Sequence, residues 1–134
     1  MKLSHVGASL LLGLTLLVGP CNAADLPASG SLTPAQTTEL YADLKDDGLV
    51  VLDVRTEAEF ADGHVEGALN IPLEELKSRI QEVPEGKPLL IVCRSGHRAS
   101  IAFDILRKLG RSTDQVWYLT GYTDYSMGTP RFYR

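Results

Sequence analysis

The sequence contains few of the residues on which disulfide-stapled or metal-bound domains depend. It has two cysteines, Cys21 and Cys93, and three histidines among 134 residues. Two cysteines exclude a disulfide-dense scaffold, and no group of Cys and His has the spacing of zinc ligands. We therefore expect no bound metal, and a hydrophobic core has to hold the fold together.

Positive charge is also scarce in this sequence. There are 13 Lys and Arg against 17 Asp and Glu, which gives a formal charge of −4. Domains that bind nucleic acid carry clustered Lys and Arg, so nucleic acid is not an expected partner. The length suits one domain of common size, and no internal repeat suggests more than one.

The one long hydrophobic run lies near the N-terminus. It extends from Val6 to Val18 after the positive charge of Lys2. At ~1.5 Å per residue a helix of this length reaches roughly 20 Å, short of the ~30 Å hydrocarbon core of a membrane. Small residues, Cys21 and Ala23, stand at the −3 and −1 positions of a cleavage site before Ala24. Residues 1–23 are therefore expected to be a secretory signal peptide. This predicts an exported protein, located in the bacterial periplasm.

Two alternatives remain for this leader. It is an uncleaved membrane anchor, or it is a lipoprotein signal in which Cys21 carries the lipid, with Pro20 at a position that favours Gly or Ala. Association with a membrane is expected only if Cys21 is lipidated. Cleavage before Ala24 would leave Cys93 as the only cysteine, and a lone thiol cannot form an internal disulfide.

The remainder alternates between apolar runs and amphipathic segments. Residues 24–32 are small and polar and are expected to be a flexible tether, followed by a single domain at 33–134. Buried strands are expected at 49–54 and 89–92, shorter strands at 68–71 and 115–119, and helices at 34–45, 56–62, 73–80 and 99–109. This order predicts an α/β fold with a central, mostly parallel sheet and helices on both faces.

The tail after Gly121 is harder to assign from its pattern. It contains Gly128 and Pro130 and is expected to be a loop or a poorly formed helix. Four aromatic residues near it, Tyr122, Tyr125, Phe132 and Tyr133, either pack against the sheet or line the approach to Cys93.

Cys93 follows the second apolar strand directly, at the carboxyl edge where α/β sheets place their functional crevice. Gly96 stands in the turn before a helix, and Arg94 and Arg98 flank it. A helix N-terminus and neighbouring guanidinium groups favour the thiolate form of a cysteine, which is the nucleophilic form. Backbone amides that curl around such a sulfur form an anion-binding nest. The alternative is a buried, inert thiol with solvated arginines around it.

Two motifs resemble those of the rhodanese family. The first comprises Asp53-Val54-Arg55, Glu57 to Phe60 and Gly63 to Pro72, and the second is Val92 to Ala99. The resemblance covers roughly residues 33–122 and implies a single rhodanese domain similar to small exported thiosulfate sulfurtransferases. Instead of the Gly-Gly and Trp usual after the last strand, this chain has Gly121-Tyr122-Thr123-Asp124-Tyr125.

The resemblance implies a role for each residue of the second motif. Cys93 would be the nucleophile that becomes a persulfide. Substrate binding would fall to the loop, with amides cradling the outer sulfur and Arg94 and Arg98 holding the anion. The loop residues concerned are Arg94, Ser95, Gly96, His97, Arg98 and Ala99. Asp53 and Arg55 would be structural residues beside the site.

Two details narrow the chemistry of the loop: its length counts against phosphate chemistry, and Arg94 favours thiosulfate as the sulfur donor. Cys93 to Arg98 is a C-x4-R loop, whereas the related phosphatase and arsenate reductase loops are C-x5-R and wider. Arg94 stands where relatives specific for mercaptopyruvate tend to have Gly, and a cation there suits a dianion. The expected partners are a small anionic sulfur donor and a thiol or cyanide acceptor. We expect no cofactor, and we expect the protein to be a monomer.

Two other functions stay open. One is a sulfur carrier that accepts persulfide from a donor protein, or a rhodanese module that binds a partner through the loop. The other is a phosphatase or arsenate reductase, which the short loop disfavours.

Overall fold

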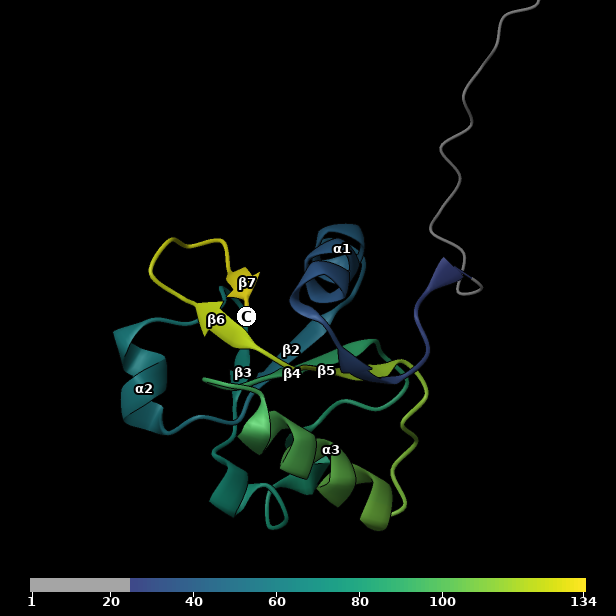
Figure 1. Cartoon of the computed structure of the whole chain (residues 1–134). Helices are drawn as coiled ribbons and strands as arrows, with labels where there is room; N and C mark the ends of the chain where they lie inside the picture. The colour runs from purple at the N-terminus through teal and green to yellow at the C-terminus, as the bar shows by residue number, and fades with distance from the viewer. Residues whose placement is uncertain (1–24) are drawn as a thin grey trace, which may run out of the picture.

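The computed structural model describes residues 25–134 (Figure 1). The signal peptide, its cleavage site and Cys21 lie outside the described residues, so these predictions stay predictions. Within the described part of the chain, no helix combines the length and the apolar character needed to cross a membrane.

A five-stranded parallel sheet forms the centre of the domain, with the strand order β1-β5-β4-β2-β3. The strands are β1 (Gly30–Leu32), β2 (Val50–Asp53), β3 (Leu69–Asn70), β4 (Leu89–Val92) and β5 (Val116–Leu119). All four residues of β4 are buried, because layers cover both faces of the sheet. The predicted α/β fold is confirmed.

Alternate residues of β4 serve two separate hydrophobic clusters. Leu90 and Val92 pack on the side of helix α1 (Pro34–Leu44), together with Trp117. Leu89 and Ile91 pack on the side of helix α3 (His97–Lys108). Figure 1 shows α1 and α3 on opposite faces of the sheet. The period-two alternation of a strand thus divides one continuous apolar run between two layers.

Two helices begin with a capping box. The Thr33 hydroxyl accepts from the Gln36 amide, and the Gln36 side chain accepts from the Thr33 amide, at the start of α1. Thr56 and Glu59 repeat this arrangement at the short helix α2 (Glu57–Asp62). Each box satisfies amides that the first helical turn leaves without a backbone partner.

The expected helix at 73–80 is replaced by two 3-10 turns, η2 (Leu73–Glu75) and η3 (Ile80–Glu82). Two competing contacts explain the difference. The Ser78 hydroxyl donates to the Glu75 carbonyl, and the Arg111 guanidinium donates to the carbonyls of Ile80 and Val83. These bonds satisfy carbonyls without a continuous helix.

The two ends of the described chain are more ordered than their composition predicts. Within the expected tether, Gly30–Leu32 form β1 and pair with β5, because Leu32 is buried there. The tail forms an antiparallel hairpin of β6 (Tyr122–Asp124) and β7 (Arg131–Tyr133), rather than a loop or helix. Phe132 of this hairpin packs edge-on against Tyr41 of α1, 6.0 Å between ring centroids, which supplies the tertiary contact that fixes the strands.

Candidate active site

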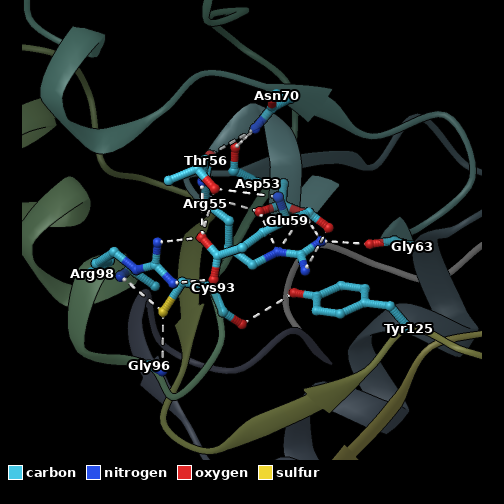
Figure 2. Close-up of polar contacts among 11 residues, drawn as sticks. Asp53, Arg55, Thr56, Glu59, Gly63, Asn70, Cys93, Gly96, Arg98 and Tyr125 are labelled. Atoms are coloured by element: carbon cyan, nitrogen blue, oxygen red, sulfur yellow. Dashed lines mark hydrogen bonds and ion pairs between the residues drawn. The ribbon is translucent and has the colours of Figure 1, made fainter. Parts of the chain in front are cut away.

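Cys93 lies at the first position after β4, where the chain turns into α3. Its Sγ accepts the backbone amide of Gly96 at 3.0 Å and that of Ala99 at 3.4 Å (Figure 2). The residue is 1 % exposed. Two amides at a helix N-terminus therefore converge on the sulfur, which stabilises negative charge on it.

Gly96 is required by the geometry of this loop. Its φ is 89°, and a Cβ built on it would lie 2.6 Å from the Leu119 carbonyl oxygen. A side chain would force the loop away from β5, and with it the amide that reaches the sulfur. The position therefore accepts only glycine without a shift of the backbone.

The other polar residues of the loop face solvent. Arg94, Ser95 and His97 are exposed. Within residues 25–134, the Arg94 side chain makes no hydrogen bond or ion pair, and it borders a cleft next to the loop. The structure thus directs the Gly96 and Ala99 amides at Sγ, while the exposed Arg94 side chain borders the cleft next to the loop.

Arg98 is held by Glu59 of α2 in a two-pronged ion pair. Its Nη1 and Nη2 atoms lie 2.8 and 2.9 Å from the two carboxylate oxygens of Glu59. The hydrogen bonds from Arg98 hold the pKa of Glu59 down, at about 2, and the same contact raises the pKa of Arg98. The pair ties the first turn of α3 to α2. Direct binding of a substrate anion by Arg98 stays a prediction.

A buried ion pair supports the neighbouring strand end. The Arg55 guanidinium binds both carboxylate oxygens of Asp53, the closest at 2.7 Å, and donates to the carbonyls of Glu59 and Gly63. The Asn70 amide in turn donates to the Asp53 and Arg55 carbonyls at 3.0 Å. These contacts connect the end of β2 to α2 and β3 beside the loop, and the roles of Asp53 and Arg55 in the function stay predictions.

Tyr125 joins this pair to the cysteine loop. Its ring lies over the Arg55 guanidinium, 3.7 Å from carbon Cζ to the ring centroid. Its hydroxyl donates to the Cys93 carbonyl at 3.0 Å, as Figure 2 shows. Burial, followed by the charge of Asp53, raises the pKa of Tyr125, so the phenol stays protonated as a donor.

An open cleft of about 320 Å³ lies beside the loop. It is lined by Arg55, Glu59, Asp62, Arg94, Thr123 and Tyr125. The Thr123 hydroxyl is buried and meets no hydrogen-bond partner in the described part of the chain. Nowhere in residues 25–134 do three or more His, Cys, Asp or Glu side chains gather as metal ligands would.

The loop, its strand and its helix match a known family over most of the chain. The model of the rhodanese-like domain matches residues 36–127. The chain belongs to the rhodanese-like domain family.

Relatives of this rhodanese-like domain include sulfurtransferases. A sulfurtransferase of Allochromatium vinosum is 36% identical over 73 residues, 54% of this chain and 66% of its own length. The thiosulfate sulfurtransferase PspE of Escherichia coli is 38% identical over 61 residues, 44% of this chain and 59% of its own length. The human single-domain sulfurtransferase TSTD1 superposes with a TM-score of 0.57 at 28% identity, covering 69% of this chain and 89% of that structure.

These matches support membership of a sulfurtransferase family but do not fix the substrate. The matched segments span about one third to two thirds of the length of the first curated relatives. The identity of the sulfur donor therefore has to be argued from this rhodanese-like domain itself.

The sequence indicated Cys93 and the loop, and offered Tyr125 only as one of four aromatic residues that pack on the sheet or line the approach to Cys93. It gave no sign of the contact between Glu59 and Arg98. Glu59 carries a visible signal only for helix capping, and it lies 39 residues from Arg98. Tyr125 lies 32 residues from Cys93 in a segment without a recognisable strand pattern. Both contacts depend on the tertiary fold.

Proposed function

We propose that this rhodanese-like domain is a thiosulfate sulfurtransferase that works through a persulfide on Cys93. The observation that carries the proposal is the convergence of the Gly96 and Ala99 amides on Sγ. Such amides stabilise a thiolate before the reaction and a charged persulfide after it. A thiolate in this position needs no general base to activate it.

The first half-reaction forms the persulfide. The Cys93 thiolate attacks the outer sulfur of thiosulfate, the S–S bond of thiosulfate breaks, and its electron pair leaves with sulfite. The exposed Arg94 guanidinium supports the dianion as it approaches and sulfite as it departs. The loop amides then face a persulfide anion instead of a thiolate.

The second half-reaction returns the enzyme to its starting form. Cyanide or a thiolate attacks the outer sulfur of the persulfide, and the electron pair of the broken S–S bond returns to the Cys93 sulfur. Thiocyanate or a new persulfide is released. Two displacements through a covalent intermediate give ping-pong kinetics.

The proposal extends to the setting of the reaction. We propose that the chain is exported and acts as a monomer in the bacterial periplasm on a small anionic donor and a thiol or cyanide acceptor. The signal peptide predicted at residues 1–23 is the feature that supports export.

Measurement of the intact mass tests the formation of the Cys93 persulfide and the cleavage of the predicted signal peptide. Purified mature protein is weighed before and after incubation with thiosulfate, with Cys93→Ser as the matched control. We expect a gain of one sulfur atom in the wild type alone, reversed by cyanide with release of thiocyanate. The same spectrum reports the N-terminal residue and any lipid on Cys21.

An unchanged mass after thiosulfate would overturn the choice of donor. If Cys93 nevertheless accepts sulfur from a persulfide donor protein, the carrier function takes its place. Sulfur transfer by the Cys93→Ser variant would overturn the assignment of the nucleophile.

A further inference from the structure

Tyr125 makes two contacts that no sequence motif indicates and that the sulfur transfer itself does not require. The ring lies against the Arg55 guanidinium, and the Tyr125 backbone lies next to Gly63, where an added Cβ would come within 3.2 Å of the Tyr125 carbonyl oxygen. Because Arg55 is itself fixed by Asp53, the phenol is held in one place. Its hydroxyl then reaches the carbonyl of the nucleophile's own residue.

We propose that Tyr125 is a positioning residue for the Cys93 loop: its hydroxyl holds the Cys93 carbonyl on the outer side of the loop and thereby turns the Arg94 amide toward the side on which Sγ lies.

The geometry of the peptide bond links these two directions. No peptide bond among residues 25–134 is cis, and in a planar trans peptide the C=O and the following N–H point in opposite directions. Figure 2 shows the Cys93 carbonyl directed to Tyr125 and Sγ directed to Gly96, on opposite sides of the backbone. An outward Cys93 carbonyl therefore leaves the Arg94 N–H on the sulfur side.

The Arg94 amide is available for a ligand. In the described part of the chain it donates to no backbone or side-chain acceptor. The Gly96 and Ala99 amides are already directed at Sγ, so Arg94 supplies a further donor to an anion that arrives next to the sulfur. A hydrogen bond to the Cys93 carbonyl also polarises that peptide and strengthens its N–H as a donor.

The hydrogen bond to the Cys93 carbonyl comes from the C-terminal hairpin. Tyr125 directly follows β6, and β7 pairs back onto β6. The aromatic residues of the tail therefore divide between two roles. Phe132 packs on α1, whereas Tyr125 reaches the cysteine loop.

Two alkylating reagents test the inference without sulfur transfer. Iodoacetate and iodoacetamide have nearly the same size, but only iodoacetate is an anion. We expect Tyr125→Phe, which keeps the ring over Arg55, to slow alkylation of Cys93 by iodoacetate about three- to ten-fold, the range of one lost hydrogen bond. The rate with iodoacetamide should stay within about two-fold of the wild type.

Tyr118→Phe is the matched control, because the Tyr118 hydroxyl makes no hydrogen bond among the described residues and its ring packs on Phe103. This variant should react with both reagents as the wild type does. In ¹⁵N-labelled protein, Tyr125→Phe should also shift the amide resonance of Arg94, which follows the Cys93 carbonyl, while Tyr118→Phe leaves it in place.

Two results would overturn the inference. One is an unchanged iodoacetate rate in Tyr125→Phe. The other is an equal loss with both reagents, which indicates a general structural effect on the sulfur. The inference concerns the loop of the proposed function but needs only an anion beside Cys93. Failure of thiosulfate to modify the wild type would therefore overturn the proposed function and leave the role of Tyr125 standing.

Discussion

At the level of single residues, the loop offers an anion two kinds of donor. Backbone amides bind the Cys93 sulfur, and the side chain of Arg94 supplies a positive charge beside it. Cys93 is buried and its sulfur accepts two backbone amides, whereas the exposed Arg94 side chain borders the open cleft. The enclosed amides stabilise charge on the sulfur whichever donor is used. The exposed cation is suited to selecting an anionic donor.

Arg94→Ala should therefore affect the first half-reaction more than the second. Loss of a charge-assisted hydrogen bond worth about 1.5 kcal/mol raises the KM for thiosulfate roughly ten-fold. The rate at which cyanide removes sulfur from the preformed persulfide should change little. Steady-state kinetics at varied thiosulfate, together with single-turnover release of thiocyanate, measure the two effects.

The control for Arg94 is Arg107→Ala. It removes the same charge from the exposed last turn of α3, where Arg107 pairs with Asp104. An equal rise in KM in both variants would mean that Arg94 acts only through the net charge of the protein.

The sequence was sufficient to identify the site residues that depend on local chain geometry. Cys93 and Gly96 are recognisable because a strand end, a turn and a helix start follow one another within a few residues. Glu59 and Tyr125 are not, because their partners are set by the packing of α2 and of the hairpin. A capping residue such as Glu59 gives no sign in the sequence that its carboxylate also binds an arginine.

At the level of elements, α2 and α3 are connected by a single ion pair. Glu59 caps α2 through the Thr56 amide and at the same time binds Arg98 in the first turn of α3. The orientation of the cysteine loop is thus linked to a helix of six residues, α2, whose own residues are all at least partly exposed.

This link should weaken in acid. The pKa of Glu59 is lowered from 4.5 to about 2 in the folded protein. The ionised Glu59 carboxylate therefore contributes fully to the free energy of unfolding when the pH is above the pKa of Glu59 in the unfolded chain. This contribution is lost as the pH falls from about 5 toward 2. Glu59→Gln lacks that contribution, so we expect the stability gap between the wild type and this variant to narrow over this interval.

Urea denaturation at a series of pH values measures the gap. Glutamine keeps a side-chain oxygen that accepts from the Thr56 amide, so the capping contact is largely preserved. Asp104→Asn, which breaks an exposed pair on α3, serves as the control. A difference in stability between the wild type and Glu59→Gln that is constant from pH 5 to pH 2 would contradict a stabilising role of the ionised Glu59 carboxylate.

Prediction from sequence was reliable for elements with strong local signals and failed where distant partners decide. The helices predicted at 34–45 and 56–62 and the buried strands predicted at 49–54 and 89–92 lie within one residue of their observed bounds. The segment at 73–80 has helical spacing of Leu73, Leu76 and Ile80, yet Arg111, which follows the end of α3, binds the carbonyls of Ile80 and Val83. The hairpin strands have three residues each, too few for a period-two pattern to stand out.

At the level of the whole molecule, the N-terminal boundary lies before Thr33. Leu32 of β1 is 2 % exposed, and the Trp117 indole of β5 donates to the Pro27 and Ala28 carbonyls. The segment that resembles a tether by composition is thus partly an edge strand of the sheet.

A chain that begins at Thr33 should be less stable than one that begins at Ala24. Losing the buried Leu32 side chain costs about 2 kcal/mol or more, and loss of the β1 hydrogen bonds adds to it. Urea denaturation gives the difference. A chain that begins at Ser29 keeps β1 but lacks the Trp117 acceptors, and it separates the two contributions. Equal stability of all three chains would mean that β1 adds nothing to the fold.

The strand order also determines when this protein can finish folding. Among residues 25–134, β1 is the first strand and pairs only with β5, so it has no partner until nearly the whole chain has been made. Pairing between such distant segments is slow, because a long loop has to close before any contact is gained. Throughout synthesis the nascent chain therefore has an incomplete sheet, and this delay keeps the chain unfolded for longer, as the export proposed above would require.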